Sequence, residues 1–204
     1  MTPRPIPRKT LAVIAALFVL SGCQPGQNGR PVPSVAQIGG DLKCVNGDHG
    51  FEDLQVGWGF CYPADWRYVE RSQGSTTPPG LDLTFDITNV PPTPVACISP
   101  DAGGHQPACS GQFGFMIIST YERGNAADLA GWVQSNLTAS PPATPPVLEP
   151  ISWGNAVEAA LLPDGSRIAL TPHHVVIMVL HSGGGYLDLE LEMSQRLGTW
   201  KFAV

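Results

Sequence analysis

The sequence predicts a single α+β domain in which a mostly antiparallel sheet is packed by one or more helices. Between residues 81 and 88, apolar side chains alternate with aspartate and threonine, a period of two that is typical of a strand with one buried face. The turn sequences at 163–166 and 182–185 are typical of hairpins, which join antiparallel strands. One segment, 126–137, carries an apolar stripe at helical spacing, and this helix is expected to lie on the sheet.

The first half of the domain is predicted to be built from strands. Segments 57–62, 66–71 and 81–90 carry aromatic and aliphatic residues between turn-forming residues. A proline-rich stretch at 91–94 ends the third strand, because proline cannot donate to a sheet ladder. A further strand follows at 113–121, and its nearly continuous apolar run predicts burial on both faces of the sheet.

The predicted helix begins at an asparagine. Asn125 is expected to be the N-cap, with Asp128 in the first turn, where a carboxylate interacts favourably with the helix dipole. The apolar stripe includes Trp132 and continues to Leu137. Residues 140–150 contain five prolines and are expected to run extended across the surface, because proline disrupts a helix interior.

The last third of the chain is predicted to hold four more strands. They are expected from residue 152 or 153 to 162, and at 167–170, 175–180 and 186–192. The strand at 186–192 is predicted because three leucines alternate there with acidic residues. A short helical turn at 193–197 and an aromatic segment at 200–202 are expected to close the chain.

The N-terminus has the pattern of a secretory signal peptide. A positively charged start is followed by an unbroken apolar run at residues 11–20 and then by small residues. The ending Leu20-Ser21-Gly22-Cys23 resembles the bacterial lipobox, and this resemblance implies acylation of Cys23 and cleavage just before it. A transmembrane anchor is the alternative, but crossing a bilayer core needs about 20 apolar residues, and polar residues end this run early.

This signal divides the chain into three parts: a signal peptide at 1–22, a flexible tether at 23–40 and a single α+β domain at 41–204. The tether is rich in glycine, proline and glutamine and has no apolar period. Two or three acyl chains give stable anchoring without a spanning helix. We therefore expect a protein lipid-anchored to the exported face of a bacterial membrane, in the periplasm or at the cell surface.

Cleavage after residue 22 would leave an acidic chain. It removes three of the 11 basic residues and none of the 17 acidic ones, so the net charge becomes −9. Nucleic-acid binding normally needs a basic surface and is excluded as a function class. The expected partners are the membrane, through lipidated Cys23, and an unidentified envelope protein.

Four cysteines remain once Cys23 is lipidated, and an even number in an exported chain predicts two disulfides. Three pairings are possible. Cys44 with Cys61 and Cys97 with Cys109 are favoured, because each pair closes a short loop that has little packing of its own. A metal site built from all four would need closely spaced cysteine pairs, which the sequence lacks.

The segment from Phe60 to Trp66 carries an aromatic-x-Tyr-Pro-x-x-Trp motif. This motif resembles the opening of PsbP-like domains, the fold of a photosystem II extrinsic subunit and of a Ran-binding protein. The order of predicted elements over 55–204 is also similar to that family, which implies an α-β-α sandwich and a role as a docking module with no shared catalytic residues. The cysteine loops and the segment at 140–150 depart from the family pattern. Alternatively, Pro63 ends a strand and Trp66 caps the core.

No sequence motif indicates catalysis. A Gly-x-Ser-x-Gly elbow, a phosphate-binding lysine loop and a Ser-x-x-Lys sequence are all missing from the sequence. His181 is followed by a serine and a glycine run, but neighbouring residues of a strand point apart, so a turn is favoured there over a base and nucleophile pair.

The carboxylates also favour a solubilising role over catalysis. Asp82 and Asp86, like Asp188, Glu190 and Glu192, fall at spacings of two and four on the expected solvated faces of leucine-rich strands. General acid and base catalysis requires a partly desolvated pair in a cleft.

Together these observations predict no catalytic residue, no metal site and no cofactor. The function that they favour is that of a noncatalytic accessory or protein-docking lipoprotein on the outer face of a membrane. The alternative is a lipoprotein that binds a small ligand or a metal, through the cysteine loops or a cleft between sheet and helix.

Overall fold

We describe a computed structural model of the chain, in which residues 38, 42–45, 47–89, 112–138, 146–182 and 187–203 are described. The chain divides into two units, Met1–Pro33 and Ser34–Val204, and every described residue belongs to the second. The predicted signal peptide, Cys23, Cys97 and Cys109 lie outside the described residues, so the lipidation and the second disulfide stay predictions.

Two antiparallel sheets make up most of the described fold. The larger sheet has seven strands in the order β3-β4-β5-β9-β8-β7-β6, and the smaller has three in the order β1-β2-β10. The larger consists of β3 (Arg67–Thr76), β4 (Pro79–Thr88), β5 (Phe113–Glu122), β6 (Glu149–Pro150), β7 (Glu158–Leu161), β8 (Arg167–Leu170) and β9 (His174–Ser182). The smaller consists of β1 (His49–Asp53), β2 (Trp58–Tyr62) and β10 (Lys201–Phe202). This architecture confirms the coarse α+β class with a mostly antiparallel sheet.

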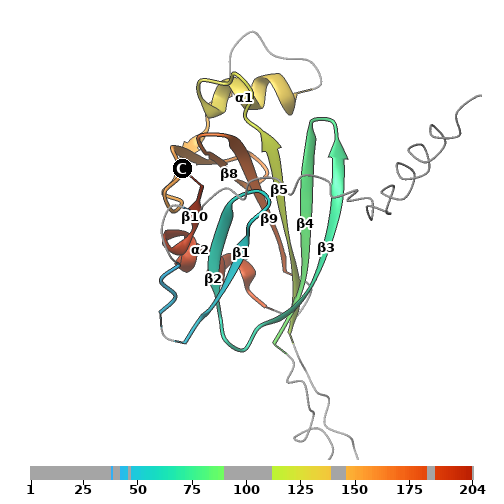
Figure 1. Cartoon of the computed structure of the whole chain (residues 1–204), viewed down its shortest axis with the longest axis vertical. Coiled ribbons are helices and arrows are strands. Elements are labelled where there is room, and N and C mark those ends of the chain that lie inside the picture. Colours follow the sequence, from blue (N-terminus) through green and yellow to red (C-terminus); the bar gives the residue numbers. More distant parts are fainter. Residues whose placement is uncertain are drawn as a thin grey trace, which may run out of the picture. The chain divides into compact units, whose positions relative to one another are not determined.

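The small sheet packs against one face of the large sheet, which we call the inner face (Figure 1). Trp58 and Phe60 of β2 form one core with Phe85 of β4 and Met178 of β9. Trp200, just before β10, stacks on Phe60 with ring centroids 4.7 Å apart. Burial of such large aromatic side chains supplies much of the apolar area that stabilises a domain.

The opposite, outer face carries the helix α1 (Leu129–Asn136). Leu129, Trp132 and Val133 of α1 are buried in a second core with residues of β7, β8 and β9. Val175 and Ile177 of β9 belong to this core, whereas the alternate β9 residues belong to the first, so the two cores lie on opposite faces of the sheet.

The helix α1 begins later than the sequence predicted. Asp128, not Asn125, is the N-cap: its carboxylate accepts a hydrogen bond from the Gly131 N–H at 2.7 Å. Asn125 lies in the turn before it. An ionised carboxylate satisfies a free helix N–H by a charge-assisted bond, so the competition between the two candidates favours the aspartate.

The predicted strand at 186–192 is wrong. The chain forms the helix α2 (Leu189–Arg196) there, with Asp188 as N-cap accepting from the Leu191 N–H at 3.0 Å. Leu189 and Met193, four residues apart, are both buried in the inner core. Alternating leucines match a strand, but the cap and the i, i+4 pair match a helix, and tertiary burial of that pair decides between them.

Three further differences concern strand boundaries and burial. The predicted strand from 152 or 153 to 162 is confined to β7, and β1 was not predicted at all. The two-sided burial predicted for 113–121 is found only in the second half of β5: Phe113 and Phe115 are 54% and 39% exposed, whereas Ser119 and Thr120 are both buried. By contrast, the strand predicted at 167–170 coincides with β8.

The segment before β7 turns instead of extending because Gly154 has a φ of +52°. A Cβ at this glycine would lie 2.2 Å from the carbonyl oxygen of Trp200, so the backbone passes too close for any side chain. The turn places Trp153 edge-on against Trp200, with ring centroids 5.0 Å apart. Gly154 is therefore needed to bring these two tryptophans together in the inner core.

We predict that Gly154→Ala destabilises the domain by more than Gly165→Ala. Gly165 also has a positive φ, +86°, but nothing lies within 4 Å of its missing Cβ, so its alanine variant should lose only the backbone term of roughly 1–2 kcal/mol. Gly154→Ala adds the clash with Trp200 and should lose several kcal/mol. Denaturant unfolding of both variants checks this, and equal losses would show that close packing at Gly154 is unimportant.

Candidate functional site

The outer face of the large sheet is only partly covered in the described structure. The register aligns Val69, Asp86, Phe115 and His181 in one row across β3, β4, β5 and β9. The next row places Thr88 opposite Phe113. The α1 core involves β7, β8, β9 and Tyr121, but none of the residues in these two rows. This corner of the outer face is therefore open among the described residues.

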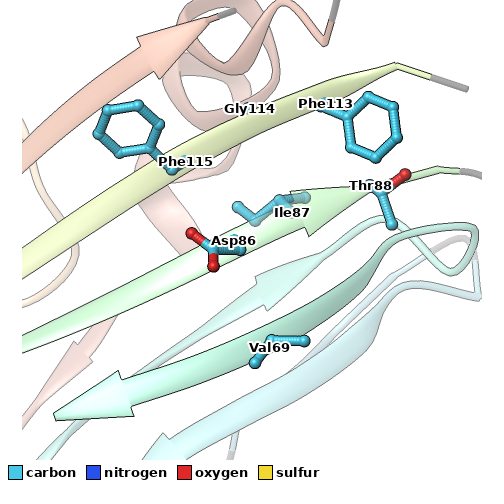
Figure 2. Close-up of a pocket in the computed structure, with 7 residues that line it drawn as sticks. All are labelled: Val69, Asp86, Ile87, Thr88, Phe113, Gly114 and Phe115. Carbon is cyan, nitrogen blue, oxygen red and sulfur yellow. The ribbon is translucent and has the colours of Figure 1, made fainter.

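The open corner forms an apolar groove of about 410 Å³, which we call the outer groove. Figure 2 shows its seven lining residues, which come from three neighbouring strands: Val69, Asp86, Ile87, Thr88, Phe113, Gly114 and Phe115. Val69 is 63% exposed, and Phe113 and Phe115, two strands away on β5, are 54% and 39% exposed. Three large apolar side chains thus share one solvent-facing surface.

The floor of the groove is held rigidly from behind. Gly114 lies between the two phenylalanines, and a Cβ on it would meet Cδ1 of Leu189 at 2.7 Å. Its glycine therefore lets α2 pack directly against the inner side of β5. On the outer side, the His181 ring stacks on the Phe115 ring at 4.3 Å and 20°. These contacts fix β5 and the orientation of Phe115.

The groove adjoins the free edge of the sheet. β3 is the terminal strand of the large sheet and pairs with β4 in an unbroken register over ten residues. Arg71 of β3 pairs with Asp86 at 2.9 Å, but both side chains are well exposed, at 64% and 47%. An exposed ion pair of this kind contributes little to stability and is readily exchanged for another partner.

A polar hollow of about 570 Å³ is the strongest alternative site. Asp164, Ser166, His181 and Glu190 contribute to its lining. The Ser166 hydroxyl donates to Asp164 at 2.6 Å, and this hydrogen bond lowers the pKa of the Asp164 carboxyl. The contact closes a turn and leaves the serine without the histidine partner that a nucleophile requires.

Glu190 of this hollow is also held in a structural contact. It binds the guanidinium of Arg167, which is 5% exposed and also donates to the Ser194 hydroxyl at 2.9 Å. Removing the Glu190 carboxylate would leave the Arg167 guanidinium buried without its charged partner. The expectation that Glu190 lies on a strand is wrong, because it lies on α2, where its half-exposed side chain holds this helix to β8.

Of the predicted site residues, Cys44 and Cys61 are brought together. Their sulfurs are 2.03 Å apart and their Cα atoms 5.4 Å apart, so the structure has the disulfide that the sequence favoured. Beside it, Arg196 of α2 binds Asp48 at 3.0 Å. These two contacts hold the segment before β1 in place: the disulfide joins it to β2, and the ion pair joins it to α2. None of the four residues lines the outer groove.

Comparison with protein-family models, curated proteins and solved structures finds no match for this chain. Among the described residues, no group of three or more His, Cys, Asp and Glu side chains is placed to hold a metal ion. Neither described helix is long and apolar enough to cross a membrane. The outer groove is therefore identified from geometry, burial and charge.

We predict that the groove phenylalanines contribute little to folding. Phe113→Ser should change the free energy of unfolding by at most about 0.5 kcal/mol, because the ring is largely in solvent. Phe85→Ala, which removes a ring that is 1% exposed, should cost about 3–5 kcal/mol. Denaturant unfolding of both variants tests this, and a loss of several kcal/mol in Phe113→Ser would mean that the ring is part of the core.

We also predict that His174 makes stability depend on pH. Burial lowers the pKa of His174, against the opposing effect of Glu122, so the unfolded chain binds a proton more readily than the folded one. Stability should therefore fall as the pH drops through the ordinary histidine value of about 6.5. Unfolding measured between pH 7.5 and 5 checks this, and His174→Gln should flatten the slope. An unchanged slope in the variant would exclude His174 as its cause.

Proposed function

We propose that this protein is a lipid-anchored, noncatalytic docking module that binds an envelope protein through the outer groove. Lipidated Cys23 would hold the domain on the exported face of a bacterial membrane. The observation that carries the proposal is the groove itself, which Val69, Phe113 and Phe115 line with exposed apolar side chains on either side of Asp86 and Thr88. Contiguous exposed apolar surface is typical of an interaction site, whereas single exposed apolar residues are common everywhere.

Charge favours a protein over the lipid surface as the occupant of the groove. The predicted mature chain has a net charge of −9, and anionic headgroups would repel it. The groove faces solvent from a sheet whose back is filled by the aromatic core. A rigid, apolar, preformed surface of this kind binds with little ordering cost.

The chemistry of the groove supports binding rather than catalysis. Asp86 and His181 share the row of Phe115, but they lie on either side of it, two strands apart. Strands are spaced about 4.8 Å apart, so the two backbones are separated by about 10 Å with a phenyl ring between them. Asp86 is paired with Arg71 instead.

We further propose that the domain is related to PsbP-like domains, in which docking is the common role. The motif from Phe60 to Trp66 supports this proposal. It ends β2 and turns into β3, with the Trp66 N–H donating to the Pro63 carbonyl at 3.0 Å and Trp66 buried in the inner core. The domain departs from the α-β-α sandwich of that family in its layers, because the inner face of the large sheet is covered by a small sheet together with α2.

Site-specific crosslinking in intact envelopes tests the docking function. We predict that a photoreactive amino acid at Phe113 of the full chain yields one reproducible protein adduct. The matched control is the same group at Val157, which is 63% exposed against 54% for Phe113 but lies outside the groove. Cys23→Ser should reduce the adduct, because the proposed anchor concentrates the domain at the membrane.

Each other result of this experiment counts against the proposal. The same adducts at Val157 and Phe113 would mean that the groove has no specificity. An adduct with a small molecule alone would favour the alternative, a small-ligand lipoprotein, for which a groove of about 410 Å³ has sufficient volume.

A further inference from the structure

The free edge of β3 is unusually regular. All ten of its residues pair with β4 in sequence, without a bulge, and the strand contains no proline. Within the described structure no strand pairs with its other side. At about 3.3 Å per residue, this edge offers roughly 33 Å of backbone N–H and C=O groups. Bulges or prolines normally protect a long flat edge from pairing with another chain. β3 has neither, so only its charged side chains can limit such pairing.

The charges of β3 are arranged around the groove. Alternate residues share a face, so Arg67, Val69 and Arg71 lie on the outer face, where Val69 belongs to the groove. Two guanidinium groups thus flank one valine. The chain carries only eight basic residues beyond position 22, against 17 acidic ones, and two of these eight lie on this face of β3, where Asp86 of β4 is the acidic partner of Arg71.

Other described arginines are used inside the fold. Arg123 donates to backbone carbonyls, including that of Thr171 at 3.1 Å, while Arg167 binds Glu190 and Arg196 binds Asp48. Arg71 differs from them, because its contact with Asp86 is at the surface. The charge of Arg71 is therefore available to a partner at little structural cost.

We propose that β3 binds an extended segment of the envelope partner as an eighth strand, and that this segment carries an acidic-x-apolar-x-acidic pattern. The apolar residue of the bound segment lies opposite Val69, so it extends the apolar surface of the groove onto the added strand. The acidic residues of the segment lie opposite Arg67 and Arg71. The pattern reads the same in both directions, so it fits a parallel or an antiparallel strand. Backbone hydrogen bonds provide affinity and the alternate side chains provide specificity.

A second copy of this chain fits the edge less well. If two β3 strands pair antiparallel about Val69 with their outer faces on the same side, Arg67 of each copy lies opposite Arg71 of the other. Centring the pair on Arg71 places that arginine opposite itself. Like charges directly opposite each other destabilise a strand pair, whereas acidic side chains at the same positions stabilise it.

An unbiased selection tests the pattern. The full-length protein is immobilised in detergent, and a display library of random ten-residue segments is selected on it. We expect enrichment of acidic residues on both sides of an apolar one at a spacing of two. Arg71→Glu should shift one acidic position to lysine or arginine, while Lys43→Glu, the same charge change at an exposed residue outside β3, should leave the pattern unchanged. Absence of enrichment, or equal effects of both variants, would overturn the proposal.

Backbone methylation distinguishes strand addition from simple charge attraction. The enriched peptide is synthesised in two forms, methylated on the odd or on the even backbone nitrogens. A strand uses the N–H groups of one edge only, so one form should lose binding and the other should retain it within about threefold. Equal binding by both forms would exclude strand addition. Arg71→Glu should weaken the unmethylated peptide by about threefold to tenfold.

This inference rests on the proposed docking function, but the two can fail separately. If the adduct at Phe113 forms and Arg71→Glu leaves its yield unchanged, docking is retained and strand addition is wrong. If the selected peptide binds β3 but no adduct forms in envelopes, the edge binds extended segments while docking at the groove is wrong. Concentration-dependent dimers that Arg71→Glu strengthens, because it puts opposite instead of like charges across the strand pair, would identify a second copy as the occupant and overturn the proposed partner.

Discussion

The aromatic packing between the two sheets is the constraint on which the rest of the structure depends. Trp58 of β2 donates its indole N–H to the Thr120 hydroxyl of β5 at 2.9 Å, a buried contact between residues 62 positions apart. Around it, Phe60 and Trp200 stack and fill the space against the inner face. A buried donor without a partner would cost about 1–3 kcal/mol, so this hydrogen bond also fixes the register of one sheet on the other. The small sheet thereby covers much of the inner face, and the outer groove lies on the opposite face.

The open corner of the outer face follows from the shortness of α1. Eight helical residues extend about 12 Å, and a helix with its side chains is about 10 Å wide, whereas seven strands spaced about 4.8 Å apart span roughly 29 Å. The helix begins at its N-cap Asp128, and the second core and the contact of Glu158 with the Leu129 N–H at 3.0 Å hold it over β7, β8 and β9. From this position α1 leaves the β3 end of the sheet uncovered. The exposure of Phe113 and Phe115 is therefore a consequence of which strands the helix covers.

The sequence predicts those parts of the fold that local patterns determine. β4 has one partly exposed and one buried face, and the alternation of apolar and polar residues at 81–88 predicts this. Its neighbour β5 was predicted to be buried on both faces, because apolar content alone does not show that α1 stops short of Phe113. Likewise, Leu189 and Leu191 fit a strand or a helix, and only the burial of Met193 one turn later decides. The groove was missed for the same reason: it depends on tertiary coverage, and its residues look like core in the sequence.

A tethered module needs only a small binding surface. By coil statistics the predicted tether of residues 23–40 would reach about 23 Å, and short flexible linkers give effective concentrations in the millimolar range. A partner in the same membrane would then be captured by contacts too weak to hold it in free solution. The outer groove and the free edge of β3 suit such weak capture. The groove offers the modest apolar area of one valine and two phenylalanines, and the edge offers directional backbone groups. An isolated free edge is prone to unspecific pairing. The arginines on either side of Val69 reduce this risk, because they oppose apolar and basic strands and accept acidic ones.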